Sequence, residues 1–260
     1  MRKVVTPYGT WNGTSCAGLA NNLLNRVCYI NVYDSSSNLL SSTTSTYDPN
    51  GNRTAVSSKA GSTSLTTSVS YFPNGTAQTV TDPNSAQTTY TYGACNGAFP
   101  TLVQEPAALS RSMTWDCGGG VVTSVTDENG KQTQYGHSDP YWRITSIMDP
   151  LNNTTTYLYS PTSVESTLLF NSGASVSDVL TTYDGLGRRR FIQQRQGPGS
   201  SSFDTIQYTY DLEGRSATVS MPCTSTAGSG CSTPVTTTTY DVLNRPSSSR
   251  REHEAAAAGV

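Results

Sequence analysis

Short segments rich in β-branched and aromatic residues recur along the chain. Segments 87–92, 154–159 and 205–210 are dense in threonine, tyrosine and isoleucine, which is typical of β-strands. Successive side chains on a strand point to opposite faces, so Tyr90 and Tyr92 project to one side. The pattern predicts strands with tyrosines on one face and threonines on the other, where they are solvated or paired across strands.

Tight-turn signals separate these segments. Two clear examples are Asp48-Pro49-Asn50-Gly51 and Asp149-Pro150-Leu151-Asn152. In each, aspartate can accept backbone N–H bonds, proline presets φ at the next position, and glycine or asparagine takes the left-handed conformation that closes a hairpin. Strand, turn and strand together predict an antiparallel β-hairpin.

The hairpin signal is repeated. Tyrosine and aspartate followed by a turn and an arginine occur four times: Tyr47, Asp48, Gly51 and Arg53; Tyr183, Asp184, Gly187 and Arg188; Tyr210, Asp211, Gly214 and Arg215; and Tyr240, Asp241 and Arg245. A second unit, with Thr-Asp or Met-Asp before the turn and tyrosine after it, occupies 81–92, 126–135 and 148–159. Self-similarity of this kind is the signature of a repeat architecture.

The arginine of each copy follows the aspartate by four or five residues. After a tight turn the two side chains can meet across the mouth of the hairpin, or the guanidinium can stack on the preceding tyrosine. Acid/base catalysis by paired carboxylates needs two of them in a cleft with separated pKa values, and a repeated motif offers no such asymmetry. We therefore expect structural turn motifs and no catalytic residues.

These repeats resemble the rearrangement-hotspot (RHS) or YD-repeat proteins, which include bacterial polymorphic toxins, cocoon subunits of toxin complexes and the teneurins. The resemblance rests on Tyr-Asp-x-x-Gly-Arg at 183–188 and 210–215 and on the second unit, and it covers about 29–245 with lapses at 95–114, 160–180 and 190–207. It implies an all-β fold of consecutive antiparallel β-hairpins in a curved, spiralling sheet. In bacterial relatives that sheet is a hollow shell, often around a toxic polypeptide.

The resemblance divides the chain into three parts. We expect an irregular N-terminal segment at 1–28, a YD-repeat β-sheet at 29–246, and a disordered or short helical tail at 247–260. The plug, self-cleavage motif and toxin region of bacterial relatives do not follow the repeats, and about ten hairpins are few for a closed chamber. We therefore expect part of a shell, as a gene fragment or a short orphan piece, with sheet edges that invite pairing.

Composition and charge narrow the class further. Only 34% of residues are hydrophobic and 13% charged, and the 36 serines and 39 threonines argue against a helical bundle. A net charge of −2 without a concentrated basic surface argues against a nucleic-acid partner. Neither a signal peptide nor an apolar run long enough to span a membrane is visible.

Six cysteines are present, with two histidines and no C-x-x-C pair, so we expect neither a metal site nor a cofactor. Neighbouring cysteines would pair as Cys16 with Cys28, Cys95 with Cys117, and Cys223 with Cys231. Free thiols remain the alternative. Disulfides would place the chain outside the cytoplasm, which favours a secreted or cell-surface protein.

Two functional hypotheses follow. The first is a non-catalytic segment of a YD-repeat β-shell that encapsulates or presents a toxin or other polypeptide, with the remainder of the shell or that polypeptide as partner. The second is an extracellular carbohydrate-binding or adhesion module, because tyrosines interleaved with Asn, Asp and Thr suit sugar rings and hydroxyls. A parallel β-helix is the alternative fold; it shares the Thr, Ser, Asn and Gly bias but not the hairpin motif.

Overall fold

The computed structural model describes residues 2–19, 23–60, 63–230, 232 and 234–252. They fall into two compact units, Met1–Gln132 and Thr133–Val260. The described residues contain β-strands and three short 3-10 turns, η1 (Cys95–Gly97), η2 (Pro106–Ala108) and η3 (Asn171–Gly173), but no α-helix. The prediction of an all-β chain is confirmed.

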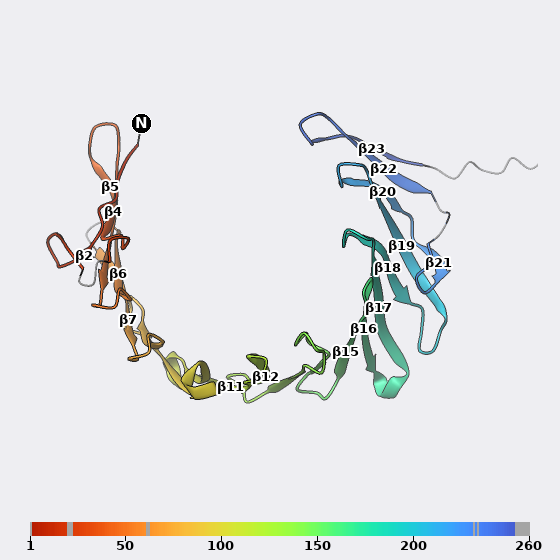
Figure 1. The fold of residues 1–260 in the computed structure, drawn as a ribbon, viewed down its shortest axis with the longest axis horizontal. Coiled ribbons are helices and arrows are strands. Elements are labelled where there is room, and N and C mark those ends of the chain that lie inside the picture. The colour runs from red at the N-terminus through yellow and green to blue at the C-terminus, as the bar shows by residue number, and fades with distance from the viewer. Residues whose placement is uncertain (1, 20–22, 61–62, 231, 233, 253–260) are drawn as a thin grey trace, which may run out of the picture. The chain divides into compact units, whose positions relative to one another are not determined.

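The first unit is a series of hairpins in chain order (Figure 1). Its strands are β1 (Lys3–Val5), β2 (Thr10–Trp11), β3 (Cys16–Ala17), β4 (Tyr29–Tyr33), β5 (Leu39–Tyr47), β6 (Arg53–Ala60), β7 (Thr63–Tyr71), β8 (Ala77–Thr81), β9 (Gln87–Ala94), β10 (Phe99–Gln104), β11 (Ser110–Asp116) and β12 (Val121–Thr126). From β4 to β12 each strand pairs with the next, β1 pairs with β4, and β2 and β3 form a separate small hairpin.

The second unit continues the same plan. Its strands are β13 (Gln132–Gly136), which begins at the last residue of the first unit, β14 (Ser146–Met148), β15 (Thr154–Tyr159), β16 (Ser163–Phe170), β17 (Ser175–Tyr183), β18 (Arg189–Arg195), β19 (Ser202–Tyr210), β20 (Ser216–Ser220), β21 (Cys223–Thr226), β22 (Val235–Tyr240) and β23 (Pro246–Arg251). β19 pairs with β20 near its end and with β21 near its start, and β22 then pairs with β20 and β23.

Every strand pairing given for the described residues is antiparallel, and consecutive hairpins account for nearly all of them. The predicted succession of antiparallel hairpins is therefore confirmed. The alternative of a parallel β-helix is wrong, because the Asp-containing turns are short enough to reverse the chain and bring each strand back beside its predecessor.

Both predicted boundaries of the repeat region differ from the structure. The segment 1–28 is not wholly irregular, since β1 is an edge strand with Lys3 opposite Tyr33. Residues 247–251 belong to β23 and not to a tail, because Thr236–Tyr240 of β22 pairs with Pro246–Arg251 in an antiparallel ladder. The part of the predicted tail at 253–260 lies outside the described residues.

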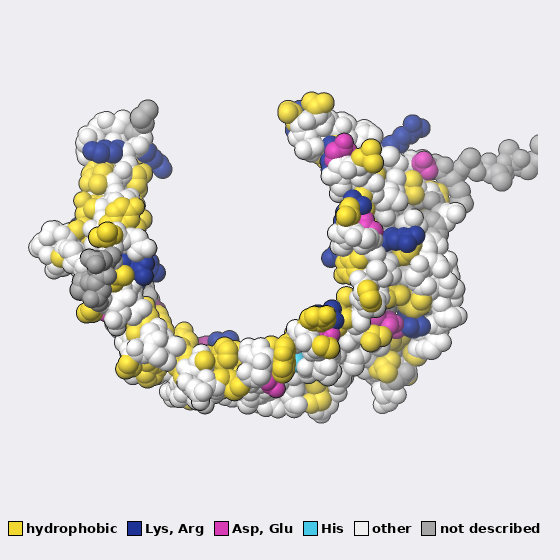
Figure 2. All heavy atoms as spheres, in the orientation of Figure 1, with side chains coloured by type: hydrophobic (Ala, Val, Ile, Leu, Met, Phe, Trp, Pro, Cys, Tyr) yellow, Lys and Arg dark blue, Asp and Glu magenta, His cyan; other side chains and the backbone are white. Residues whose placement is uncertain are grey.

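The sheets bury few apolar side chains. Among the described residues the buried hydrophobic ones are Cys28 and Val103 in the first unit and Phe191 and Phe203 in the second. Hydrophobic side chains are visible on the surface of both units (Figure 2). Contacts within the plane of the sheet, between neighbouring hairpins, therefore contribute much of what holds the strands in register.

Hydroxyl groups provide part of that contact. The side chains of Thr209 and Thr218 are 2.6 Å apart across the β19–β20 pair, and those of Ser70 and Thr79 are 2.7 Å apart across β7–β8. Cross-strand threonine pairs of this kind contribute about 0.2–1 kcal/mol each. The abundance of serine and threonine thus serves strand pairing as well as solubility.

Candidate functional site

The repeated aspartates close the hairpin turns. Asp184 Oδ1 accepts hydrogen bonds from the backbone N–H groups of Leu186 and Arg188, both at 2.9 Å. The Gly187 N–H donates to the Asp184 carbonyl at 3.0 Å. The same bonds from residues two and four positions later reach Asp34, Asp48, Asp82, Asp127, Asp149, Asp211 and Asp241.

The second carboxylate oxygen binds the side chain four positions after the aspartate, and we call this pair the turn lock. Its members are Asp184 and Arg188 (2.7 Å), Asp211 and Arg215 (2.6 Å), Asp241 and Arg245 (2.7 Å), Asp34 and Asn38 (2.8 Å), Asp48 and Asn52 (2.9 Å), and Asp149 and Asn153 (2.8 Å). Asn52 thus takes the place that the sequence suggested for Arg53, because the turn brings the fourth residue, not the fifth, back to the carboxylate.

These contacts favour the ionised aspartates. Hydrogen bonds from the backbone and then the guanidinium of Arg245 hold the pKa of Asp241 below its ordinary value. In a related turn, the hydrogen bond from the Arg143 guanidinium is the largest cause that lowers the pKa of Asp139 to about 2. Every carboxylate of this kind is already bonded to its own turn, which suits a structural role.

Two of the three turn-lock arginines, Arg188 and Arg215, also reach the next hairpin. Arg188 Cζ lies 4.3 Å from the centroid of the Tyr210 ring, and Arg215 Cζ lies 4.6 Å from that of Tyr240. The sequence suggested stacking on the preceding tyrosine of the same copy. The structure differs because the antiparallel register of β18 with β19, continued toward the turn, brings Tyr210 and not Tyr183 opposite Arg188.

Tyr210, Tyr240 and four other aromatic residues each donate a hydrogen bond to a backbone carbonyl of the neighbouring chain segment. The six donors and acceptors are Tyr47 and Val27 (3.0 Å), Tyr71 and Arg53 (2.9 Å), Trp115 and Pro100 (2.8 Å), Tyr159 and Ile144 (2.8 Å), Tyr210 and Arg189 (2.9 Å), and Tyr240 and Ser216 (3.0 Å). We call this bond the inter-hairpin clamp. The aromatic ring of a clamp lies opposite the residue that precedes the acceptor carbonyl.

One clamp uses an aromatic pair in place of arginine and tyrosine. The Phe99 and Trp115 rings stack with centroids 4.5 Å apart, and Trp115 Nε1–H donates to the Pro100 carbonyl. This clamp has the same arrangement of ring and carbonyl hydrogen bond as the arginine–tyrosine clamps, although its residue types differ. Sequence reasoning missed this pair, because only Trp115-Asp116 retains a trace of the tyrosine–aspartate signal.

Two predicted cysteine pairs are present as disulfides. Cys16–Cys28 joins the β2–β3 hairpin to the start of the main sheet, with Cα atoms 5.9 Å apart, and Cys95–Cys117 connects η1 to the turn after β11, at 5.3 Å. Cys223 is also disulfide-bonded. Its predicted partner, Cys231, lies outside the described residues.

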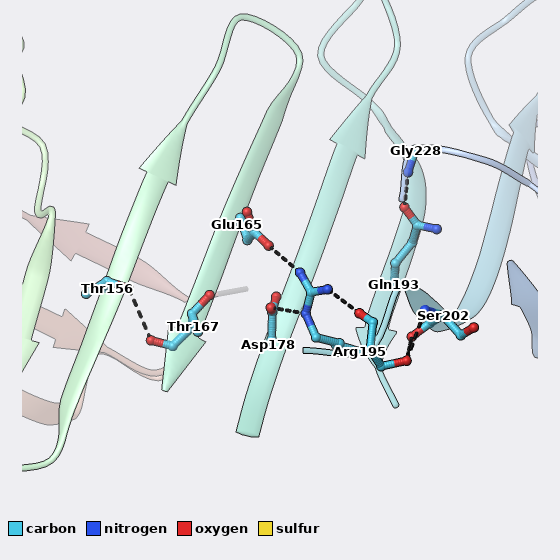
Figure 3. A network of polar contacts seen from close by, with 9 residues as sticks. Thr156, Glu165, Thr167, Asp178, Gln193, Arg195, Ser202 and Gly228 are labelled. Carbon is cyan, nitrogen blue, oxygen red and sulfur yellow. Dashed lines mark hydrogen bonds and ion pairs between the residues drawn. The ribbon is translucent and has the colours of Figure 1, made fainter. Parts of the chain in front are cut away.

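A buried polar cluster in the second unit escaped the sequence analysis (Figure 3). The fully buried Gln193 amide donates to Thr205 Oγ1 at 2.9 Å and accepts from the Gly228 N–H at 2.6 Å, which fastens the segment after β21 onto β18 and β19. Beside it, Arg195 pairs with Asp178 at 2.5 Å and with Glu165 at 3.3 Å. Isolated glutamine and arginine residues give no sequence signal for such a cluster.

Burial is the main cause that raises the pKa of Glu165, followed by the neighbouring Asp178 carboxylate, while Arg195 opposes both. Arg195 also lies over the Phe203 ring at 4.5 Å. The cluster therefore joins β16, β17, β18 and β19 through one guanidinium. Its carboxylates are engaged in holding strands together.

The first unit contains a groove of about 700 Å³ between the β2–β3 hairpin and the sheet. Trp11 and Tyr29 line it with their rings edge to face, 5.9 Å between centroids. Serine and threonine residues of the sheet also line it, at Ser42, Thr44, Thr46, Ser57, Ser64 and Thr66. The groove combines aromatic and hydroxyl groups on one surface.

Neither a metal-binding cluster nor a membrane-spanning helix is present in the part of the chain that the structure describes. No cluster of three or more His, Cys, Asp or Glu side chains suited to a metal ion occurs there. Within the same residues, no helix has the length and apolar character to cross a membrane.

No family model matches the chain, and no curated protein matches it. Among solved structures, the crystal structure of TcdB2-TccC3 without hypervariable C-terminal region aligns with 85% of this chain at 14% identity and a TM-score of 0.58. A Photorhabdus luminescens Tc holotoxin pore aligns with 92% of it at 13% identity and a TM-score of 0.40. The chain spans 14% of the first structure and 16% of the second. The first alignment shows that this succession of antiparallel hairpins is a fold already seen in a solved structure.

Proposed function

We propose that the chain is a non-catalytic segment of a β-shell that encapsulates or presents another polypeptide, as the RHS/YD-repeat resemblance implies. The inter-hairpin clamp is the observation that carries the proposal. Each clamp joins one hairpin to the next through a backbone carbonyl, so a wall can be extended by adding hairpins. The fold likeness to TcdB2-TccC3 supports the same interpretation.

The mechanism is mechanical. With only four buried apolar side chains among the described residues, the wall depends on turn locks and clamps that repeat along it. Stability in such repeat structures is a sum of nearest-neighbour terms, and an array can be lengthened without redesigning a core. A wall of this construction separates what it encloses from solvent and proteases.

The partner in this proposal is the remainder of a larger shell, or the polypeptide that the shell holds. The disulfides favour a location outside the cytoplasm, where oxidising conditions preserve them. Acting as a wall requires no bound cofactor and no catalytic residue, and the turn carboxylates are committed to their own turns.

Small-angle X-ray scattering on the oxidised chain tests the proposal. A compact globule of 260 residues has a radius of gyration of about 18 Å. A wall segment is expected to exceed this value clearly and to show a pair-distance distribution with a long tail. A value near 18 Å with a symmetric distribution contradicts the proposal.

A second candidate function, carbohydrate binding, is favoured by the groove in the first unit. Sugar rings stack on aromatic faces, and the serine and threonine hydroxyls that line the groove with Trp11 and Tyr29 suit sugar hydroxyls. Titration with a panel of oligosaccharides, followed by tryptophan fluorescence, is expected to give a response that Trp11→Ala abolishes. Trp142→Ala, in the second unit, is the matched control. A response unchanged by Trp11→Ala, or none at all, excludes this groove.

A further inference from the structure

The last strand, β23, presents an open edge. It pairs with β22 on one side, and no other described strand of the second unit lies along its other side (Figure 1). All six residues from Pro246 to Arg251 are exposed. Unpaired N–H and C=O groups of such an edge can bind another strand by main-chain hydrogen bonds.

Arg245, which precedes β23, corresponds to Arg188 and Arg215 but has no aromatic partner of an inter-hairpin clamp among the described residues. It keeps its turn lock with Asp241, but its side chain is 72% exposed, against 30% for Arg188 and 26% for Arg215. Those two arginines each lie over a tyrosine of the next hairpin. Among the described residues no ring lies over Arg245.

The six clamps of the chain predict where the missing ring belongs. Continued toward the turns, the strand registers bring each aromatic residue opposite the residue before the acceptor carbonyl, as the β18–β19 register brings Tyr210 opposite Arg188. Pro246 occupies the position of Ser216, since Tyr240 pairs with Pro246 as Tyr210 pairs with Ser216, after the same shift of register. An incoming aromatic residue opposite Arg245 would therefore donate to the Pro246 carbonyl.

The positive charges on β23 specify which residue types suit the rest of the incoming strand. Arg250 and Arg251 lie five and six residues after Arg245, so they face the positions five and six residues before the incoming aromatic residue. Opposite charges directly across a strand pair are stabilising and like charges are destabilising. Acidic residues at those two positions therefore complement β23.

A second copy of this chain does not meet that requirement. Its own first strand leads to Tyr8, which is 60% exposed, but the residues five and six positions before Tyr8 are Lys3 and Arg2. Head-to-tail pairing would place Lys3 opposite Arg250 and Arg2 opposite Arg251. β23 thus repels the edge strand of this chain that a tyrosine follows, β1, among the described residues.

We infer that β23 is the docking edge for a β-strand of another polypeptide segment, with tyrosine or tryptophan opposite Arg245 and acidic residues five and six positions earlier. The inference rests on the proposed shell function and specifies the partner of one edge. It also explains the exposed guanidinium at 245 and the basic pair at 250–251 together.

Charge reversal of the first strand tests this chemistry with the full chain. Arg2→Glu combined with Lys3→Glu gives the chain a strand with acidic residues five and six positions before Tyr8. Sedimentation velocity over a range of concentrations is expected to show head-to-tail assembly, with an association constant raised at least about tenfold over the unaltered chain. High salt should reverse it.

The opposite reversal, Arg250→Glu with Arg251→Glu, is expected to promote assembly equally, because the new carboxylates would lie opposite Lys3 and Arg2 of the second copy. Combining all four substitutions should abolish assembly again, since both strands are then acidic. Adding Arg245→Ala to the first double variant should weaken assembly by removing the ring contact. Circular dichroism confirms that each variant is folded.

Either of two results overturns the inference: folded double variants that remain as dispersed as the unaltered chain, or assembly that survives both Arg245→Ala and the fourfold variant. Small-angle X-ray scattering on the unaltered chain, which is expected not to assemble, tests the shell proposal separately. A compact particle whose charge-reversed variants still assemble would reject the shell function and leave the docking edge in place.

Discussion

Tyr240 links two hairpins through its ring and its hydroxyl independently. The ring lies under Arg215, and the hydroxyl donates to the Ser216 carbonyl at 3.0 Å. Tyr240→Phe retains the ring and removes the hydrogen bond. A hydrogen bond of this kind contributes about 0.5–1.5 kcal/mol, so we expect the free energy of unfolding in urea to fall by that amount.

Tyr8→Phe is the matched control for that prediction. Tyr8 is an exposed tyrosine outside the clamps, and its hydroxyl has no hydrogen-bond partner among the described residues. Its substitution should leave the urea midpoint unchanged. Equal midpoints for Tyr240→Phe and the unaltered chain would show that the carbonyl contact contributes nothing to stability.

At the scale of the element, the turn lock requires one residue with positive φ. Gly187 supplies it at φ +75°, and Asn244 supplies it at φ +62° in the equivalent turn. A Cβ added at Gly187 meets nothing within 4 Å, so the effect of a substitution there is conformational. We expect Gly187→Val to lower the free energy of unfolding by about 1–2 kcal/mol, and Gly187→Asn by much less.

Urea unfolding of the two Gly187 variants, with both concentrations of half-unfolding compared, checks this prediction. The asparagine variant is the internal control because asparagine already occupies this place in the molecule. If both variants lose the same stability, the backbone conformation is not what the turn selects at this position.

The hairpins were predictable from sequence because their determinants are local. An aspartate, the turn residues and the side chain four positions later suffice, although Asn52 took the place expected for Arg53. The clamps were not predictable, since they join residues whose separation varies with strand length. Phe99 and Trp115 are 16 residues apart, whereas Arg215 and Tyr240 are 25 apart. No fixed spacing in the sequence marks them.

At the scale of the whole molecule, the same reasoning applies to the polar cluster around Gln193 and Arg195. Its polar side chains come from β16, β17, β18 and β19, with the Gly228 N–H after β21, and each is an ordinary polar residue within its own strand. Only the register of four strands brings them together. The sequence therefore predicts the repeated plan well and the irregular additions to it poorly.

Acid sensitivity is a property of the whole chain, because the turn locks are distributed along it. The pKa values of seven turn aspartates are lowered in the folded state, at Asp34, Asp48, Asp139, Asp149, Asp184, Asp211 and Asp241. A carboxyl whose folded pKa lies below its unfolded value of 3.8 stabilises the fold above that pH, and this contribution is lost as the pH falls through the folded pKa.

We therefore expect the urea midpoint to be nearly constant from neutral pH to about pH 5 and to fall steeply between about pH 4 and pH 2. Glu165 acts in the opposite sense, since burial raises its pKa, but it is one group against seven. Asp139→Asn retains an acceptor for the Tyr141 N–H and removes the charge that Arg143 binds, so this variant should show a shallower fall below pH 4. A midpoint that stays level down to pH 2.5 would mean that the turn locks act through hydrogen-bond geometry alone, with no contribution from the carboxylate charge.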